Sequence, residues 1–90
     1  MQLKETCDMM CSTDYKERFI AEYRQLENRC FGLLKMVNKW ERGKLDFEPS
    51  CPISLYRLQL RAMQDYLAIL EARAKIEGIV LHHEVDIEID

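Results

Sequence analysis

The sequence lacks the cysteine spacing of a zinc site or a disulfide framework. Its four cysteines are Cys7, Cys11, Cys30 and Cys51. They include no CxxC pair, the arrangement that structural zinc sites and thioredoxin-like redox sites use. The first ten residues also lack the basic-then-apolar pattern of a secretory signal, so we expect a reducing cytosol. The cysteines are therefore predicted to be free thiols that pack as small buried hydrophobes.

Motifs for catalysis and for membrane insertion are missing as well. The sequence has no glycine-rich phosphate loop, no nucleophile elbow and no HExxH motif. We therefore predict that the protein is not an enzyme and needs no cofactor. No apolar run approaches the roughly 18 residues that cross a bilayer, so no membrane partner is expected.

The chain is short and rich in both apolar and charged side chains. It has 90 residues, of which 48% are hydrophobic and 32% are charged, and residues 1–90 are expected to form one domain. A core of this size gives only a few kcal/mol of net stability, so disulfides, a metal or self-association often supplement it. Because neither disulfides nor zinc are expected, self-association is the favoured supplement.

Positive charge is concentrated in the first half of the chain, although the net charge is −3. Residues 13–44 carry eight basic and five acidic side chains, a balance of +3. The last fourteen residues carry five acids and no Lys or Arg. Long nucleic acid is therefore a poor partner, because binding to a polyanion requires a broad basic face. A local basic cluster could still hold a small anion.

The N-terminal segment is predicted to form a short helix, because Leu3, Cys7 and Met10 have helical spacing. Residues 12–13 would end it. Cys7 and Cys11 lie one turn apart and could bind a soft metal, but no nearby histidine completes such a site. We therefore expect both thiols to be buried.

A long helix is predicted over residues 14–42. Asp14, followed three residues later by Glu17, is a variant of the capping box that makes Asp14 the N-cap. Gly43 is expected to end the helix. Apolar residues repeat within it at steps of four and three. They are Phe19, Tyr23, Leu26, Cys30, Leu33, Val37 and Trp40.

A second long helix is predicted over residues 52–77, after a stiff loop. Ser50 and Pro52 are typical of a helix start, and Gly78 is typical of a helix end. Two apolar stripes run along this helix on different faces. The first stripe is Tyr56, Leu60, Met63, Leu67, Leu70 and Ala74, and the second is Leu55, Leu58, Ala62, Tyr66 and Ile69.

Two stripes cover more of the helix surface than one neighbouring helix can bury. A contiguous apolar face left in water usually marks an interaction surface. The predicted fold class is therefore all-α: an antiparallel hairpin of two long helices, with a short helix before it, that assembles into a homo-oligomer.

Residues 79–90 form an acidic tail in which apolar and charged residues alternate, as in a strand. A lone strand is not stable by itself, so the tail is expected to pair with another chain or to be disordered, with disorder favoured for its last few residues. His82 and His83 would point to opposite sides of a strand, so we do not expect them to share a metal ion.

The start of the long helix has the features of an anion site. Its first backbone N–H groups are unpaired and lie at the positive end of the helix dipole. Tyr15, Lys16 and Arg18 lie in this turn, so a ring that can stack on a base stands beside two cations that can hold phosphate. The alternative is that Tyr15 packs half-buried and both cations are solvated.

Two stretches of the chain resemble a family of small tailed-phage proteins. The first is DYKERFIAEY at residues 14–23, followed by Leu26, Arg29 and Leu33. The second is LQLRAMQDYLAILEAR at residues 58–73, which is similar to the family's pattern of Leu, Gln-Leu, Ala-Met, Tyr, Leu and Arg. The resemblance covers about residues 14–77. The family is the phage anti-CBASS cyclic-nucleotide sponges, where CBASS is cyclic-oligonucleotide-based antiphage signalling.

The resemblance implies a compact helical homohexamer in the host bacterial cytoplasm. Such sponges sequester cyclic dinucleotides, cGAMP among them, and cyclic trinucleotides, and they withhold the signal from its effector without degrading it. The resemblance also implies dinucleotide pockets between protomers. In these pockets a tyrosine stacks on a base and a basic residue contacts phosphate.

Carried onto this sequence, the stacking tyrosine is Tyr15. The basic residue is best matched by Arg29, where the family usually has lysine, and a shift of one position would place Cys30 there instead. Arg73 is matched to a trinucleotide contact. The predicted ligand contacts are Tyr15, Lys16, Arg18, Arg29 and Arg73. The alternative function is a helical adaptor that inhibits a host or phage protein through its second apolar stripe.

Overall fold

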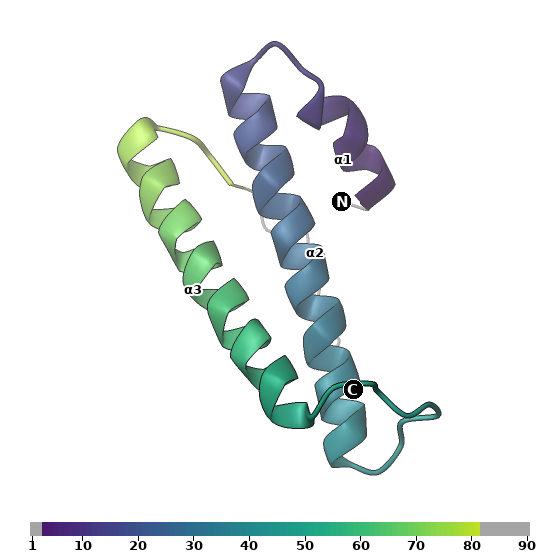
Figure 1. The fold of residues 1–90 in the computed structure, drawn as a ribbon. Coiled ribbons are helices and arrows are strands. Elements are labelled where there is room, and N and C mark those ends of the chain that lie inside the picture. The colour runs from purple at the N-terminus through teal and green to yellow at the C-terminus, as the bar shows by residue number, and fades with distance from the viewer. Residues whose placement is uncertain (1–2, 82–90) are drawn as a thin grey trace.

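The computed structural model describes residues 3–81, and these residues form three helices and no strand. The helices are α1 (Leu3–Met10), α2 (Tyr15–Glu41) and α3 (Ile53–Glu77). α2 lies between the other two: α3 runs antiparallel to it, and α1 folds back along its first half (Figure 1). The predicted all-α hairpin with a short first helix is confirmed. The tail beyond Leu81, with His82 and His83, lies outside the described residues.

The two ends of α2 are fixed by local signals. Asp14 is the N-cap, and its Oδ1 accepts the N–H of Lys16 at 2.9 Å, as predicted. The N–H of Asp14 itself is donated to Ser12 Oγ at 3.0 Å, the bond that a full capping box would give to Glu17. At the other end Gly43 has a φ of 68°, and the chain turns there. The N–H groups of residues 43 and 44 then donate to the carbonyls of residues 40 and 39, at 3.0 and 2.9 Å, which is a Schellman motif.

α3 begins one residue later than predicted and ends where predicted. Pro52 is its N-cap, with extended backbone and no side-chain capping bond, so the first helical residue is Ile53. The N–H of Leu55 donates to Pro52 O at 3.1 Å. Gly78 adopts a φ of 71° at the C-terminal end, and the N–H of Ile79 donates back to Ala74 O at 2.8 Å.

The core lies at the open end of the hairpin, where α2 begins and α3 ends. It consists of Phe19, Tyr23, Leu70, Ala74 and Ile79. Sequence periodicity had assigned Ile79 to the acidic tail. The left-handed turn at the residue before it brings this side chain back onto α2 and α3, where it is 7% exposed.

The two apolar stripes of α3 have different surroundings. The first packs against α2, and its residues Leu60, Leu70 and Ala74 are buried. The second stripe is exposed along the whole helix: Leu58 and Ile69 are 63% and 58% exposed, and Tyr66, whose hydroxyl reaches a side chain of α2, is 43% exposed. The prediction that one neighbouring helix covers only one stripe is therefore confirmed.

All four cysteines are free thiols, but their predicted burial is only partly correct. Cys30 is buried and Cys51 is half-buried, whereas Cys7 and Cys11 are exposed, so the prediction is wrong for these two. The reason is the rotation of α1, which turns Thr6 toward α2 instead. Thr6 is fully buried, and its hydroxyl accepts a hydrogen bond from Gln25 Nε2 at 2.9 Å.

The structure also gives one finding on metal binding and one on membrane insertion. Within residues 3–81, no three His, Cys, Asp or Glu side chains lie close enough together to hold a metal ion. The three helices of this range are also too polar or too short for any of them to span a membrane.

Candidate functional site

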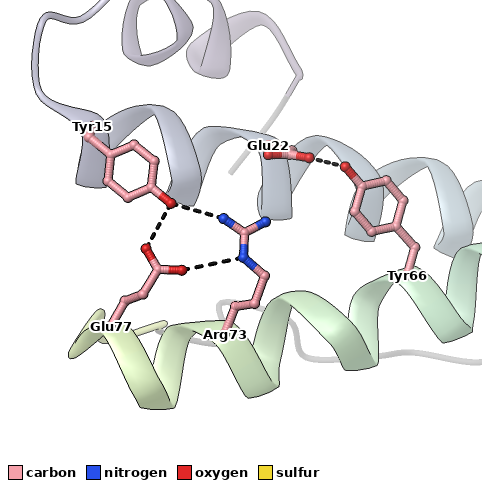
Figure 2. A network of polar contacts seen from close by, with 5 residues as sticks. All are labelled: Tyr15, Glu22, Tyr66, Arg73 and Glu77. Atoms are coloured by element: carbon pink, nitrogen blue, oxygen red, sulfur yellow. Dashed lines mark hydrogen bonds and ion pairs between the residues drawn. The ribbon is translucent and has the colours of Figure 1, made fainter.

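The candidate site lies where the first turn of α2 faces the last turn of α3. Tyr15 is the first residue of α2, because the Asp14 cap starts the helix there. Tyr15 is exposed, with 46% of the residue's surface open to solvent. Arg73 and Glu77 face it from α3, and they lie one helical turn apart (Figure 2). The antiparallel hairpin thus brings together residues that are about 60 positions apart in the sequence.

Three polar contacts link these side chains into a closed triangle. The hydroxyl of Tyr15 donates to Glu77 Oε1 at 2.7 Å. Arg73 Nη2 donates to the same hydroxyl at 2.9 Å, and Arg73 Nε donates to Glu77 Oε2 at 3.3 Å (Figure 2). The tyrosine oxygen therefore donates one hydrogen bond and accepts another.

A buried aromatic ring lies beneath this triangle. Phe19 is 3% exposed, and the Arg73 guanidinium carbon lies 5.1 Å from the centre of its ring. The rings of Tyr15 and Phe19 are 6.2 Å apart between centroids and are tilted by 55°. Arg73 is therefore held by a cation–π contact as well as by hydrogen bonds, which limits its freedom compared with an ordinary surface arginine.

The electrostatics of the site keep Tyr15 protonated. The hydrogen bond to Glu77 raises the pKa of the Tyr15 hydroxyl above its ordinary value, partial burial adds to this effect, and the charge of Arg73 opposes it. The site therefore presents a neutral hydroxyl donor, a fixed guanidinium and an exposed aromatic face. A ring of this kind can stack on a base, and a guanidinium beside it can hold a phosphate oxygen.

The structure separates the other three predicted contacts from this pair. Arg18 Nη1 donates to the carbonyl of Ser12 at 2.7 Å, so it supports the turn between α1 and α2. Lys16 is exposed, and its backbone N–H is taken by the N-cap. Arg29 is exposed and lies fourteen residues after Tyr15, roughly 21 Å further along the helix. Within one chain, only Arg73 of the predicted cations reaches Tyr15.

The sequence did not point to Glu77 or Phe19 as parts of a site. Glu77 was counted only among the acids of the C-terminal end, and Phe19 only in the core pattern. The signal that could have identified Glu77 is its spacing of four residues after Arg73, which allows an ion pair on a helix.

Tyrosine–glutamate contacts recur along the α2–α3 interface. The hydroxyl of Tyr66 on α3 donates to Glu22 on α2 (Figure 2). The hydroxyl of Tyr23 on α2 donates to Glu71 on α3 at 2.7 Å. Burial, foremost, and the bond to Glu71 raise the pKa of Tyr23. With the Tyr15 contact, these bonds connect the two helices at three levels.

A second group of cations lies at the opposite end of α2. The residues that line it are Lys35, Lys39, Arg42 and Lys44, around a hollow of about 220 Å³. They account for much of the basic excess of residues 13–44. Among the described residues that line it there is no aromatic ring, and the nearby Phe31 ring is already in contact with Lys35 Nζ, 5.4 Å from the ring centre.

Comparison with known proteins gives one result. A family model, Sequestin, matches residues 13–76, which is most of the chain. The match covers all of α2 and all of α3 except its last residue, Glu77. No curated protein and no solved structure matches the chain. The chain belongs to the Sequestin family, the anti-CBASS cyclic-oligonucleotide sponges that its two long helices resemble.

Proposed function

We propose that this protein is a non-catalytic sponge in the host bacterial cytoplasm. It binds the cyclic di- and trinucleotide signals of CBASS defence, cGAMP among them, and so prevents activation of their effector. The observation that carries the proposal is the Tyr15–Arg73 pair above Phe19. That pair already holds an anionic group, the carboxylate of Glu77, with a hydroxyl and a guanidinium donor.

The chemistry of this pair fits a cyclic oligonucleotide. Each nucleotide unit of such a ligand offers a base for stacking and a phosphodiester with one negative charge. The exposed ring of Tyr15 supplies a stacking surface, and Arg73 supplies a charge-assisted hydrogen bond. Sequestration requires tight binding and no bond cleavage. A stacking ring and a phosphate-binding cation are therefore the types of group that it needs, and no catalytic group is required.

The exposed stripe of α3 supports an assembly that completes the pocket. Arg73 follows Ile69 by four residues, so it continues this stripe into the site. A second copy of the chain that covers the stripe would therefore lie beside Arg73. In the proposed homo-oligomer, a hexamer, the neighbouring protomer supplies its Arg29 to the phosphate that Tyr15 and Arg73 cannot enclose alone. We place Lys16 and Arg18 at the rim of this pocket, where Arg18 would have to give up its bond to the Ser12 carbonyl to contact a ligand.

A release assay tests the proposal directly. The protein is incubated with a panel of cyclic di- and trinucleotides, freed of unbound ligand, boiled, and the released compounds are identified by chromatography. We expect at least one ligand to be retained and to return unchanged. Cleaved products would exclude a sponge in favour of a phosphodiesterase, and retention of no compound would refute nucleotide binding.

The adaptor alternative is separated from the sponge by assembly size. The exposed apolar stripe would serve equally well to dock a host or phage protein. Light scattering should show a closed higher oligomer if the stripe joins copies of this chain. A monomer or dimer that retains no nucleotide would favour the adaptor.

A further inference from the structure

The ligand-binding groups of the candidate site are occupied by a side chain of the protein itself. Glu77 accepts the hydroxyl of Tyr15 on one carboxylate oxygen at 2.7 Å and Arg73 Nε on the other at 3.3 Å. Arg73 Nη2 donates a hydrogen bond to the Tyr15 oxygen at 2.9 Å. A phosphate that approaches this pair therefore meets a carboxylate that already accepts from the Tyr15 hydroxyl and from Arg73 Nε.

We propose that Glu77 is a built-in competitor of the ligand phosphate, and that nucleotide binding displaces its carboxylate from Tyr15 and Arg73. This inference rests on the proposed nucleotide-binding function of the site. A carboxylate and a phosphodiester are both anions that accept hydrogen bonds from the same donors. With both held at one guanidinium, the repulsion between their charges would weaken the binding of each.

The placement of Glu77 makes it the partner that leaves. It is the last residue of α3, directly before the left-handed Gly78. Its side chain is 33% exposed and that of Arg73 is 46% exposed, and ion pairs with this much solvent around them are weak. Arg73 keeps the ring of Phe19 after the carboxylate moves, because that ring is fixed in the core.

The need to displace the Glu77 carboxylate adds a free-energy cost that every ligand of the site has to overcome. Inorganic phosphate offers a charge but no base, so it must replace the carboxylate without any gain from stacking. A cyclic nucleotide replaces the carboxylate and stacks on Tyr15 in the same step. Glu77 thus lowers the occupancy of the site by free phosphate, whereas a ligand that also stacks on Tyr15 can still bind.

The test is the variant Glu77→Gln, which keeps an acceptor oxygen for the Tyr15 hydroxyl and removes the negative charge. Loss of the solvent-exposed ion pair that the ligand has to break corresponds to a gain in affinity of at most about fivefold. Calorimetry at low salt should therefore show that the variant binds cyclic GMP–AMP more tightly than the unmodified protein does, by up to about fivefold. The gain should shrink at 0.5 M salt because ions screen the Glu77–Arg73 ion pair that competes with the ligand. Inorganic phosphate at millimolar concentration should compete with cyclic GMP–AMP in the variant more than in the unmodified protein.

The matched control is Glu22→Gln. Glu22 also accepts a tyrosine hydroxyl across the same two helices, from Tyr66, and the triangle of Tyr15, Arg73 and Glu77 does not include it (Figure 2). We expect its affinity for cyclic GMP–AMP to stay within about twofold of the unmodified protein. An equal gain in both variants would show a general charge effect and would overturn the competitor role.

The remaining outcomes separate this inference from the proposed function. If the unmodified protein binds a cyclic nucleotide and Glu77→Gln binds it equally well or more weakly, the competitor role is overturned and the proposed function stands. Glu77 would then position Arg73 or have no role. Binding by the variant only would support the inference strongly. If neither protein binds any cyclic di- or trinucleotide, the function and the inference both fail. Circular dichroism of each variant confirms that the helices are intact.

Discussion

The two apolar faces of α3 are alike in sequence and opposite in environment. Both repeat Leu, Ala and Tyr at steps of three and four residues, with a methionine on one face and an isoleucine on the other. One face packs on α2, with Leu70 fully buried, and the other leaves its neighbour Ile69 58% exposed. The hairpin needs only the first face for its core. The second is therefore free to serve assembly, and it leads along α3 to Arg73 and the candidate site.

The largest effect on stability is expected from the packed face. Leu70→Ala removes a fully buried side chain from the core and should lower the free energy of unfolding by about 2–5 kcal/mol. Urea denaturation followed by circular dichroism measures the loss. A cost below about 1 kcal/mol would mean that this face does not form the core, and the distinction between a packed and an exposed face of α3 would be wrong.

The next effect concerns the exposed face. Ile69→Glu places a charge in the proposed contact between copies, where burial of isoleucine would contribute about 1.5–3 kcal/mol. Light scattering should show smaller particles, while the helix content measured by circular dichroism should stay unchanged. Ligand retention should fall with the assembly. An intact oligomer would show that copies associate through another surface.

A change at Tyr15 should weaken ligand binding without disturbing the core packing or the assembly, for which the two faces of α3 serve. Tyr15→Ala removes the stacking ring, and loss of one base–aromatic stack reduces affinity by about tenfold or more. Calorimetry with a cyclic dinucleotide measures this, and light scattering should find the oligomer unchanged. Tyr15→Phe is the matched control, since it keeps the ring and removes only the hydroxyl that Glu77 and Arg73 share.

The smallest effect is expected at Tyr23, which lies in the packed interface. Tyr23→Phe removes the hydrogen bond to Glu71 and should cost about 1 kcal/mol at pH 7. Burial raises the pKa of Tyr23, so the folded protein keeps it neutral where the unfolded chain ionises near pH 10. Its contribution to stability is thus full below pH 10 and is lost as the pH rises further.

Denaturation at pH 8 and pH 11 checks this linkage. The unmodified protein should lose stability between these values, and Tyr23→Phe should lose less. Part of the decline should remain in the variant, because the pKa of Tyr15 is raised too, first by its bond to Glu77. An equal decline in both proteins would contradict the role of Tyr23.

The helices could be predicted from the sequence because their signals are local. The Asp14 cap, the glycines at positions 43 and 78, and the steps of three and four residues each act within one or two turns. The exposure of Cys7 could not be predicted, because the rotation of a short helix depends on a distant partner. Here that partner is Gln25, which binds Thr6.

The candidate site shows the same limit. Chemistry and resemblance singled out Tyr15 and Arg73 separately, since each has the side chain that a nucleotide needs. Their contact depends on the antiparallel register of α2 and α3, which the loop and the core packing set together. Glu77 was missed because its role exists only once that register brings it against Tyr15. No sequence period encodes a contact across 62 residues.

The single tryptophan of the chain lies at the closed end of the hairpin. Trp40 meets Tyr56 edge-on, with 5.9 Å between ring centroids, one residue before the Glu41–Arg57 ion pair. It is roughly 37 Å along α2 from Tyr15, at 1.5 Å per residue. Its emission spectrum is therefore an intrinsic optical signal for separation of the two helices at that end. Within one chain this signal is independent of what stacks on Tyr15, so one sample can report opening of the hairpin and occupancy of the site through different chromophores.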